Sequence, residues 1–416
     1  MRGRRPVGGL DRTWQGEPVV IAIGPVAVPS PTALAAAVRR LAAFPATTRL
    51  DRTVDAAGRW WRPLPPVARA GCVHELPAFG DPERLLQAVA RLDRGGSPFA
   101  FVLSGDVLVL AVDHVLGDGY YMTRLLAAAI ELATTGDEPE WLRRPPARFP
   151  LVCAVWQQFG RDPARVRALW AHARATRPPL AAGGRTRPWR PSPATCVRSS
   201  GSHALRELKA WRRAHASGIS TIPLAIAAAE VAQRAAGVDQ AGAPLVLFDA
   251  RRYLRPDGAD VTGNFCAGLR LELADPGDPV SVDAAIKQAV ALGRPLAVTA
   301  AAALTSAVRR RPVIDRAPVT PAWDVAYTHM GKPPELARVT RTGRRRASYV
   351  GLLPPSGPAG VTFAMSEIGD QLNVSVSFHD NVIDPVAVAD VTDRLVTDPA
   401  GLLEAHRTAD LLEIPS

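Results

Sequence analysis

The chain of 416 residues contains only four cysteines and three lysines, and its apolar runs are short. The cysteines are far apart and form no Cys-x-x-Cys pair, so we expect reduced thiols in a cytoplasmic protein. No apolar run reaches the length of a transmembrane helix. The early stretch Val19–Val28 is interrupted by Pro25 and does not directly follow the basic N-terminus, so we interpret it as a buried strand rather than a signal peptide.

The positive charge comes almost entirely from arginine. With 50 Lys and Arg residues against 39 Asp and Glu, the formal net charge is +11. This favours an anionic partner such as a phosphorylated cofactor, an acidic carrier protein or nucleic acid. The chain has no zinc-finger spacing, RNP-like aromatic pattern or concentrated basic helix, so we expect no nucleic acid. The basic segments Arg161–Arg174 and Arg338–Arg346 would attract an anion, although solvated surface is the simpler interpretation of the first.

The length and composition predict two globular domains of mixed α/β structure. Hydrophobic residues make up 47% of the chain and charged residues 21%, which is typical of a globular protein with a sizeable core. Strand-like and helix-like segments occur in both halves. Residues 177–195 are rich in proline and glycine and form the clearest linker, so we expect domains at 1–176 and 196–416. Residues 1–18 are expected to be an irregular lead-in.

Local signals predict several of the elements. A capping residue followed by proline marks five helix starts, at Ser30-Pro31, Asp81-Pro82, Asp162-Pro163, Asp384-Pro385 and Asp398-Pro399. The segments Phe99–Leu103 and Val107–Val112, joined by a Ser-Gly-Asp turn, predict a β-hairpin. Three more strands are expected near residues 348–352, 361–366 and 372–378.

The hairpin leads directly into a histidine at a strand end. Val107–Val112 is followed by Asp113-His114 and then by the tight turn Asp118-Gly119, after which apolar residues recur at helical spacing. A histidine in such a turn can face a cleft. Since an imidazole with a pKa of about 6.5 is largely neutral near pH 7, it can take a proton from a nucleophile. The alternative is a buried structural histidine in the turn.

Four segments of the chain, in this order, resemble one large family. The His114-x-x-x-Asp118-Gly119 segment is similar to the active-site motif of the chloramphenicol-acetyltransferase-like superfamily, which includes acyl-CoA-dependent acyltransferases, nonribosomal peptide synthetase condensation domains and polyketide-associated acyltransferases. The other segments that resemble this superfamily are Phe248–Arg251 with Gly263-Asn264-Phe265, Val325–Gly331, and Leu372–Asp380 with Ile383-Asp384. Together they extend over roughly residues 20 to 405.

The resemblance implies a fold and a reaction. The fold would be two chloramphenicol-acetyltransferase-like domains in a V-shaped pseudo-dimer with a central tunnel, and His114 would lie in that tunnel as general base. It would accept a proton from a hydroxyl or amine that attacks an acyl thioester. The donor substrate would be acyl-CoA or a phosphopantetheinyl carrier protein, with no bound cofactor and no metal. Asp118 would pair with an arginine, for which Arg251 is the candidate, and Gly119 would share this structural role.

The remaining site candidates have simpler alternatives. Thr328 is placed by the resemblance where it could donate to the oxyanion of a tetrahedral intermediate. Its alternative is a strand-end threonine that bonds its own backbone, and the alternative for Arg251 is an exposed surface arginine. Asn264 is expected to brace the turn at Gly263 rather than to contact substrate. Cys266 is expected to be a packed thiol.

Three departures from the family pattern narrow the expected function. Asp113 stands where many relatives carry a second histidine, Ala267 and Gly268 stand where condensation domains commonly have asparagine, and His329 replaces the asparagine of an Asn-x-Gly segment. These changes favour a free-standing enzyme of specialised metabolism that makes an ester or amide with a small-molecule acceptor, and we expect a monomer. CoA and carrier protein are not separated as donors, nor hydroxyl and amine as acceptors.

Two other classes of protein stay open at this point. The chain could be a catalytically idle relative that binds a carrier protein and recruits or positions partners. It could also be a basic α/β protein that binds phosphorylated ligands and matches the motifs by chance.

Overall fold

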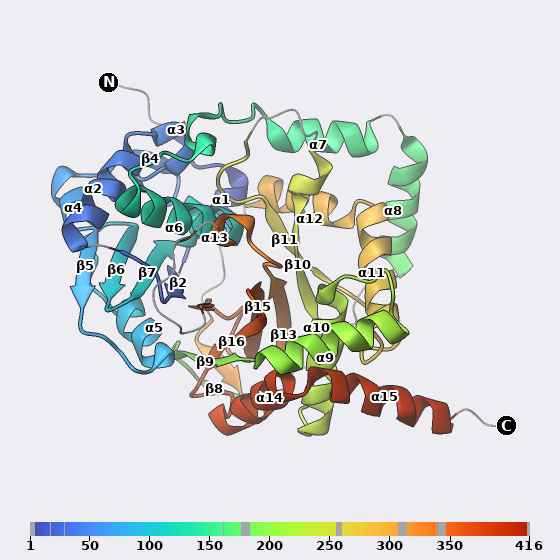
Figure 1. Cartoon of the computed structure of the whole chain (residues 1–416). Helices are drawn as coiled ribbons and strands as arrows, with labels where there is room; N and C mark the ends of the chain where they lie inside the picture. Colours follow the sequence, from blue (N-terminus) through green and yellow to red (C-terminus); the bar gives the residue numbers. More distant parts are fainter. Residues whose placement is uncertain are drawn as a thin grey trace.

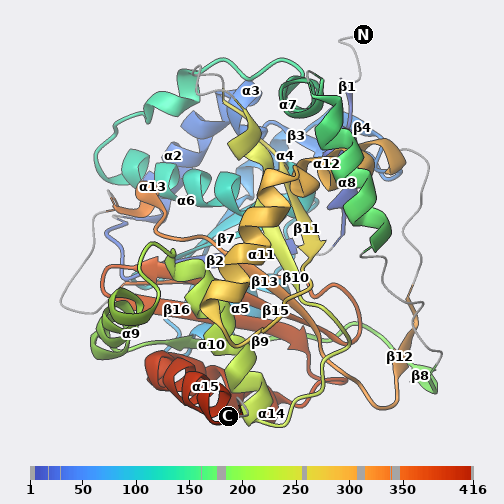
Figure 2. The ribbon, with the colours of Figure 1, turned by 90° about the vertical axis from the view of Figure 1, so that its right-hand side faces the viewer.

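The structure is a computed structural model that describes residues 5–16, 18–28, 30–160, 162–175, 184–254, 260–306, 314–337, 339 and 347–413. Two lobes, each built on a central β-sheet with helices packed against it, make up the molecule (Figures 1 and 2). The predicted α/β class is confirmed. Most of the basic segment Arg338–Arg346, and Arg161, lie outside the described residues. Among the described residues, no helix has the length and apolar character needed to cross a bilayer.

The sheet of the first lobe has five strands. In spatial order they are β14 (Ser348–Leu352), β2 (Pro18–Gly24), β7 (Val107–Asp113), β6 (Phe99–Ser104) and β5 (Val73–Leu76). All neighbours are antiparallel except β5 and β6. The predicted hairpin is formed by β6 and β7, and the predicted early strand is β2.

A strand from the second half of the chain completes this first sheet. Strand β14 pairs with β2, with Tyr349 opposite Ile23. It lies far beyond the linker predicted at residues 177–195, so the second half of the sequence contributes to both lobes. Residues 177–183 of that linker lie outside the described residues, and its remainder contains β8 (Thr186–Pro188) and the start of β9 (Pro193–Ser199).

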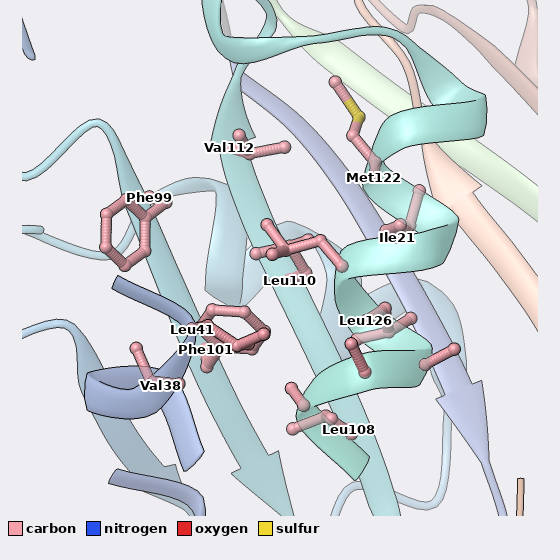
Figure 3. Close-up of a cluster of buried hydrophobic side chains, with 14 of the residues drawn as sticks. Ile21, Val38, Leu41, Phe99, Phe101, Leu108, Leu110, Val112, Met122 and Leu126 are labelled. Carbon is pink, nitrogen blue, oxygen red and sulfur yellow. The ribbon is translucent and has the colours of Figure 1, made fainter. Parts of the chain in front are cut away.

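Alternating side chains of β7 fill the core on both faces of the first sheet. Leu108, Leu110 and Val112 lie with β6 and the helices α2 (Pro31–Ala42) and α6 (Gly119–Thr134), as Figure 3 shows. Val109 and Ala111 lie on the other face with α5 (Pro82–Ala90). Because both faces are covered, the strand is almost continuously apolar. Helix α2 starts as predicted, at the cap formed by Ser30.

The sheet of the second lobe has six strands. In spatial order they are β11 (Cys266–Arg270), β10 (Leu245–Asp249), β13 (Asp324–His329), β15 (Gly360–Ile368), β16 (Gln371–His379) and β9. Strand β13 is parallel to both of its neighbours. The core of this second lobe lies between the sheet and the helices α9 (Ser202–His215), α10 (Thr221–Ala235), α11 (Pro279–Ala291), α14 (Pro385–Thr397) and α15 (Pro399–Glu413).

Serine side chains connect the two sheets. Along β16, Val374 and Val376 lie in the core of the second lobe, while Ser375 and Ser377 alternate with them. The Ser375 hydroxyl accepts a 3.0 Å hydrogen bond from Gly351 N–H, and the Ser377 hydroxyl accepts one of 3.0 Å from the N–H of Leu353. Strand β14 is the edge strand of the first sheet, and these serine hydroxyls of β16 bond backbone N–H groups at that edge.

The described part of the N-terminal segment contains regular secondary structure, contrary to the irregular lead-in predicted for residues 1–18. Within its described part, Arg5–Pro6 form β1 and Gly9–Thr13 form the short helix α1. Helix α1 packs against α12 (Arg294–Thr305) of the second lobe and against the 3-10 turn η1 (His114–Leu116). The other described elements are α3 (Pro45–Thr48), β3 (Arg52–Val54), β4 (Trp60–Pro63), α4 (Pro66–Ala70), η2 (Glu140–Arg143), α7 (Pro150–Phe159), α8 (Pro163–Ala175), η3 (Ala250–Tyr253), β12 (Arg316–Pro318) and α13 (Pro334–Ala337).

Truncation of the buried Leu110 tests the packing of the first lobe. Leu110 is completely buried between β7 and the helices above it. Leu110→Ala removes apolar contacts and leaves a cavity, so we expect the free energy of unfolding to fall by about 2–5 kcal/mol in urea titrations. Val67→Ala, at a side chain that is 83% exposed, should change it by less than about 0.5 kcal/mol. Equal effects of the two substitutions would contradict this packing.

Candidate active site

A cavity of about 220 Å³ lies between the lobes. From the first lobe, β2, α6 and β14 contribute to its wall; from the second, β10, β13, β15 and β16 do. The wall is mainly apolar, and its polar members include His114, Asp118, Arg251, Thr328 and His329. Gly119 also lines it, while Gly263 and Asn264 are not among the lining residues. Mainly apolar cavities with a few convergent polar groups are typical ligand sites.

His114 is delivered to this cavity by the end of β7. The strand stops at Asp113, a single 3-10 turn follows, and the Asp118 carboxylate caps α6 by accepting a hydrogen bond from the N–H of Tyr121. Asp113 itself pairs with Arg94 at 2.8 Å. The strand end, the turn and the helix cap together fix the backbone of the histidine.

Asn264 determines which nitrogen of His114 carries hydrogen. Its Nδ2 donates to the backbone carbonyl of His114 at 2.8 Å and to the Asp11 carboxylate at 3.1 Å. Two acceptors on that side fix the orientation of the amide, so its Oδ1 faces His114 Nδ1 at 3.0 Å. Nδ1 must therefore donate, and in the neutral ring Nε2 carries the lone pair. The expected bracing role of Asn264 is thus incomplete, because the residue contacts the histidine side chain itself.

A partly buried ion pair supports Asn264 from behind. Asp11 also accepts a 3.2 Å hydrogen bond from the backbone N–H of Asn264 and pairs with Arg49 at 3.0 Å. Arg49 donates to the carbonyls of Leu116 and Thr262, which lie in different lobes. Gly263 has a φ of +94°, and a Cβ there would lie 2.4 Å from the Arg49 guanidinium. The turn thus needs glycine for its conformation and for this approach.

Trp14 covers one face of the imidazole. Its ring is stacked on His114 with centroids 4.4 Å apart and an interplanar angle of 13°. Stacking of this kind, together with the Asn264 bond, restrains both the plane and the rotation of the histidine ring.

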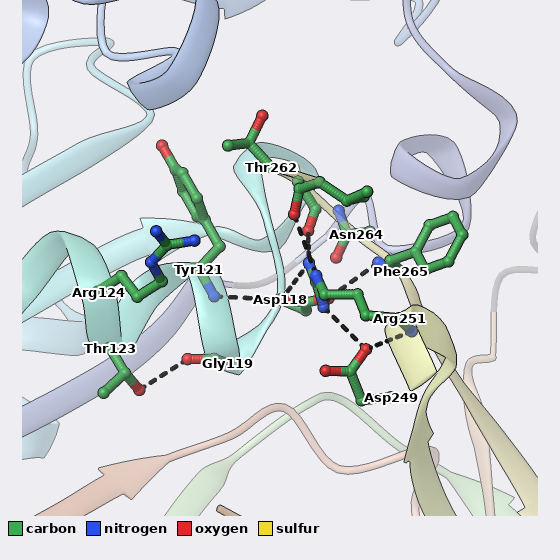
Figure 4. A network of polar contacts seen from close by, with 12 residues as sticks. Asp118, Gly119, Tyr121, Thr123, Arg124, Asp249, Arg251, Thr262, Asn264 and Phe265 are labelled. Carbon is green, nitrogen blue, oxygen red and sulfur yellow. Dashed lines mark hydrogen bonds and ion pairs between the residues drawn. The ribbon is translucent and has the colours of Figure 1, made fainter. Parts of the chain in front are cut away.

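Asp118 and Arg251 form a fully hydrogen-bonded pair across the lobes (Figure 4). The two guanidinium nitrogens lie 2.9 and 3.2 Å from the two carboxylate oxygens, and the carboxylate also accepts from Phe265 N–H. All five N–H groups of Arg251 are used, the others going to Asp249, Val261 and Gly263. Burial opposes the charge of Arg251, but Asp118 and Asp249 raise its pKa above the ordinary value. Arg251 is thus not an exposed surface arginine.

The other predicted residues differ in what they contact. Thr328 and His329 both line the cavity at the end of β13. Gly119 lies against the Met330 side chain. Burial, and the nearby Asp118 carboxylate, raise the pKa of Cys266 well above its ordinary value, so its thiol stays protonated. The residue is half-buried and lines the cavity, so it is not the fully packed thiol that was predicted. Among the described residues, no group of three or more His, Cys, Asp or Glu side chains is placed to hold a metal ion.

Three residues of the site were not predicted from the sequence, namely Asp11, Trp14 and Arg49. All three reach the site from segments without a helical or strand period, and none belongs to a recognisable motif. The only local hint of a functional role is that polar and aromatic residues follow one another at positions 11 to 14. Nothing in that pattern indicates a contact with residue 264.

Comparisons with known proteins identify the fold. No protein-family model and no curated protein matches the sequence. Among solved structures, a trichothecene 15-O-acetyltransferase from Fusarium sporotrichioides has a TM-score of 0.66 at 14% identity, covering 96% of this chain and 95% of that one. The first condensation domain of the calcium-dependent antibiotic synthetase, in complex with a substrate analogue, has a TM-score of 0.63 at 16% identity, covering 97% and 96%. The chain therefore has the two-lobed chloramphenicol-acetyltransferase-like fold that its sequence predicted.

The same fold also supports a different reaction. The epimerization domain from the third module of tyrocidine synthetase B has a TM-score of 0.56 at 13% identity, covering 96% of this chain and 94% of that one. Since a fold can carry several activities, the reaction has to be argued from the site.

Removal of Arg251 tests the ion pair that crosses the lobes. Arg251→Met leaves a buried, unpaired carboxylate, so we expect the free energy of unfolding to fall by about 3–5 kcal/mol. Arg394→Met breaks an exposed pair with Asp390 and should cost less than about 1 kcal/mol. The double variant Asp118→Asn with Arg251→Met should recover part of the loss. An Arg251→Met protein no less stable than Arg394→Met would contradict the interpretation.

Proposed function

We propose that this protein is an acyltransferase in which His114 acts as general base, moving an acyl group from a thioester to a hydroxyl or amine. The observation that carries the proposal is the hydrogen bond that joins Nδ1 of His114, a residue of the cavity wall, to Oδ1 of Asn264 behind it. It leaves the lone pair of the neutral ring at Nε2, as proton abstraction requires. The fold adds support, since an acetyltransferase and a condensation domain share it.

In the proposed reaction, Nε2 takes the proton of the acceptor as its oxygen or nitrogen attacks the thioester carbonyl. A tetrahedral intermediate forms, and its oxyanion needs a donor, for which Thr328 is the candidate on the cavity wall. The intermediate collapses by breaking the carbon–sulfur bond. Nε2 then transfers this proton to the departing thiolate, so His114 ends the cycle neutral.

The donor in this proposal is acyl-CoA or the acyl-phosphopantetheine of a carrier protein. Both are anionic, and the net charge of +11 would attract either one. The acceptor is a small molecule with a hydroxyl or an amine, in keeping with a role in specialised metabolism. Asp118, Gly119 and Arg251 position the base and do not take part in the chemistry.

The replacement of His114 by alanine tests the general-base role. Wild-type protein is incubated with a panel of acyl-CoA and acyl-carrier thioesters and a mixed pool of alcohols and amines, and thiol release and acylated product are measured. We expect His114→Ala to lower the rate of transfer by about 10²–10⁴-fold, because the proton acceptor is lost. The control is His203→Ala, at an imidazole that is 79% exposed, which should keep full activity.

The same experiment separates the idle alternative. If wild type and His114→Ala give equal rates while a carrier protein still binds to both, the protein is a carrier-binding relative and the proposed chemistry is wrong. The donor that supports turnover, CoA or carrier, identifies the physiological class of thioester.

The replacement of Asn264 tests whether orientation of the base matters for turnover. Asn264→Ala removes the acceptor for Nδ1–H, so we expect kcat to fall by about 10-fold to 100-fold with little change in KM. Asn373→Ala is the matched control, because Asn373 is equally buried and is hydrogen-bonded to Ser199 in the second lobe. It should lower stability but not kcat. A loss of kcat equal in both variants would indicate a general structural effect instead.

A further inference from the structure

A second histidine lines the cavity and has no part in the proposed proton transfer. His329 is the last residue of β13, directly after Thr328. Its Nδ1 accepts a 2.8 Å hydrogen bond from the backbone N–H of Gly331. Its Nε2 is buried and has no hydrogen-bond partner within the part of the chain that the structure describes. Buried polar atoms in native proteins are nearly always partnered, so such an atom beside a cavity points to a ligand.

The contact with Gly331 fixes the protonation of the His329 ring. A backbone N–H can only donate, so Nδ1 is the acceptor and the neutral ring carries its hydrogen on Nε2. Burial lowers the pKa of His329 to about 4, although the charge of Glu367 opposes this shift. Near pH 7 the ring is therefore neutral, and it presents an N–H donor rather than a base.

Methionine side chains share the cavity wall with His329. Three of the four methionines in the chain line the cavity, namely Met122, Met330 and Met365. Met365 stands opposite His329 in the pairing of β13 with β15, and Met330 follows His329 in sequence. The sulfur of Met330 packs closely against Gly119, since a Cβ added to this glycine would lie 3.2 Å from the sulfur. Methionine is flexible and polarizable, so this wall can adapt to flat or irregular apolar groups.

We propose that His329 and these three methionines form a substrate subsite for a mostly apolar group that carries one hydrogen-bond-accepting oxygen. The Nε2–H group donates to that oxygen, a keto, ether or hydroxyl oxygen of the acyl group or acceptor that does not react. A neutral donor in an apolar wall selects strongly for such an oxygen, because an analogue without it leaves the donor unpaired. The inference rests on the proposed function, since it names a substrate class for the same cavity.

Matched ligand pairs test the subsite by equilibrium binding, without turnover. The donor pairs are the pantetheine thioesters of 4-methoxybenzoate and 4-ethylbenzoate, and of 3-oxooctanoate and octanoate; the acceptor pair is 2-(4-methoxyphenyl)ethanol and 2-(4-ethylphenyl)ethanol. Binding is measured calorimetrically to the His114→Ala protein, so that no product forms. We expect at least one oxygen-bearing ligand to bind about 10-fold more tightly than its partner. Adding His329→Phe should reduce that ratio to about one, while the oxygen-free ligand still binds.

His379→Phe is the matched control. His379 is also buried, and its Nδ1 also accepts a backbone N–H, from Ser192 at 3.1 Å, but it does not line the cavity. This variant should leave the binding ratio unchanged. If no pair is discriminated, or if His329→Phe weakens both members of a pair equally, the subsite is refuted. Because binding is read without turnover, this result is independent of whether His114 catalyses transfer.

Discussion

The two lobes meet at a buried ion pair, Asp118 with Arg251, and the geometry of the site depends on it. Moving two charges out of water is costly, and a buried pair is tolerated only when the remaining donors and acceptors are satisfied. Here Arg251 uses all five of its N–H groups. Asp118 accepts two backbone N–H groups besides the guanidinium, one from Tyr121 in its own lobe and one from Phe265 in the other.

The orientation of His114 follows from this pair. Arg251 also holds the carbonyls of Val261 and Gly263, and so it positions the loop that carries Asn264. Arg49 holds the same loop from the first lobe through Thr262. A histidine of one lobe is therefore oriented by an asparagine of the other, and any change in how the lobes meet would change the direction of its ring.

Elements whose signals lie within a few residues could be predicted from the sequence. A capping residue was enough to predict α2, and short apolar runs with a turn were enough for β2 and the hairpin that ends at His114, because these signals act locally. The resemblance to the superfamily also implied that Asp118 pairs with Arg251. Strand β14 was predicted as a strand but not as part of the first sheet, since periodicity does not specify the partner of a strand.

The supporting residues could not be predicted, because their roles come from distant contacts. Asp11 bonds Asn264 across 253 positions of sequence. A short helix with one aspartate has no period that marks the aspartate as buried, and Trp14 gives no sign that it stacks on an imidazole. The role of Asn264 was underestimated for the same reason: its turn was visible in the sequence, but its neighbour was not.

The amide between Asp11 and His114 separates orientation from charge. A carboxylate placed directly on Nδ1 would both orient the ring and bind the imidazolium. Here the charge of Asp11 is matched by Arg49, and the group that Asn264 places against His114 Nδ1 is a neutral oxygen. In the proposed transfer the imidazolium is short-lived, because it gives the acceptor's proton to the departing thiolate. A thioester is already activated, so the base needs a fixed direction more than a permanent counter-charge, and this arrangement provides that direction.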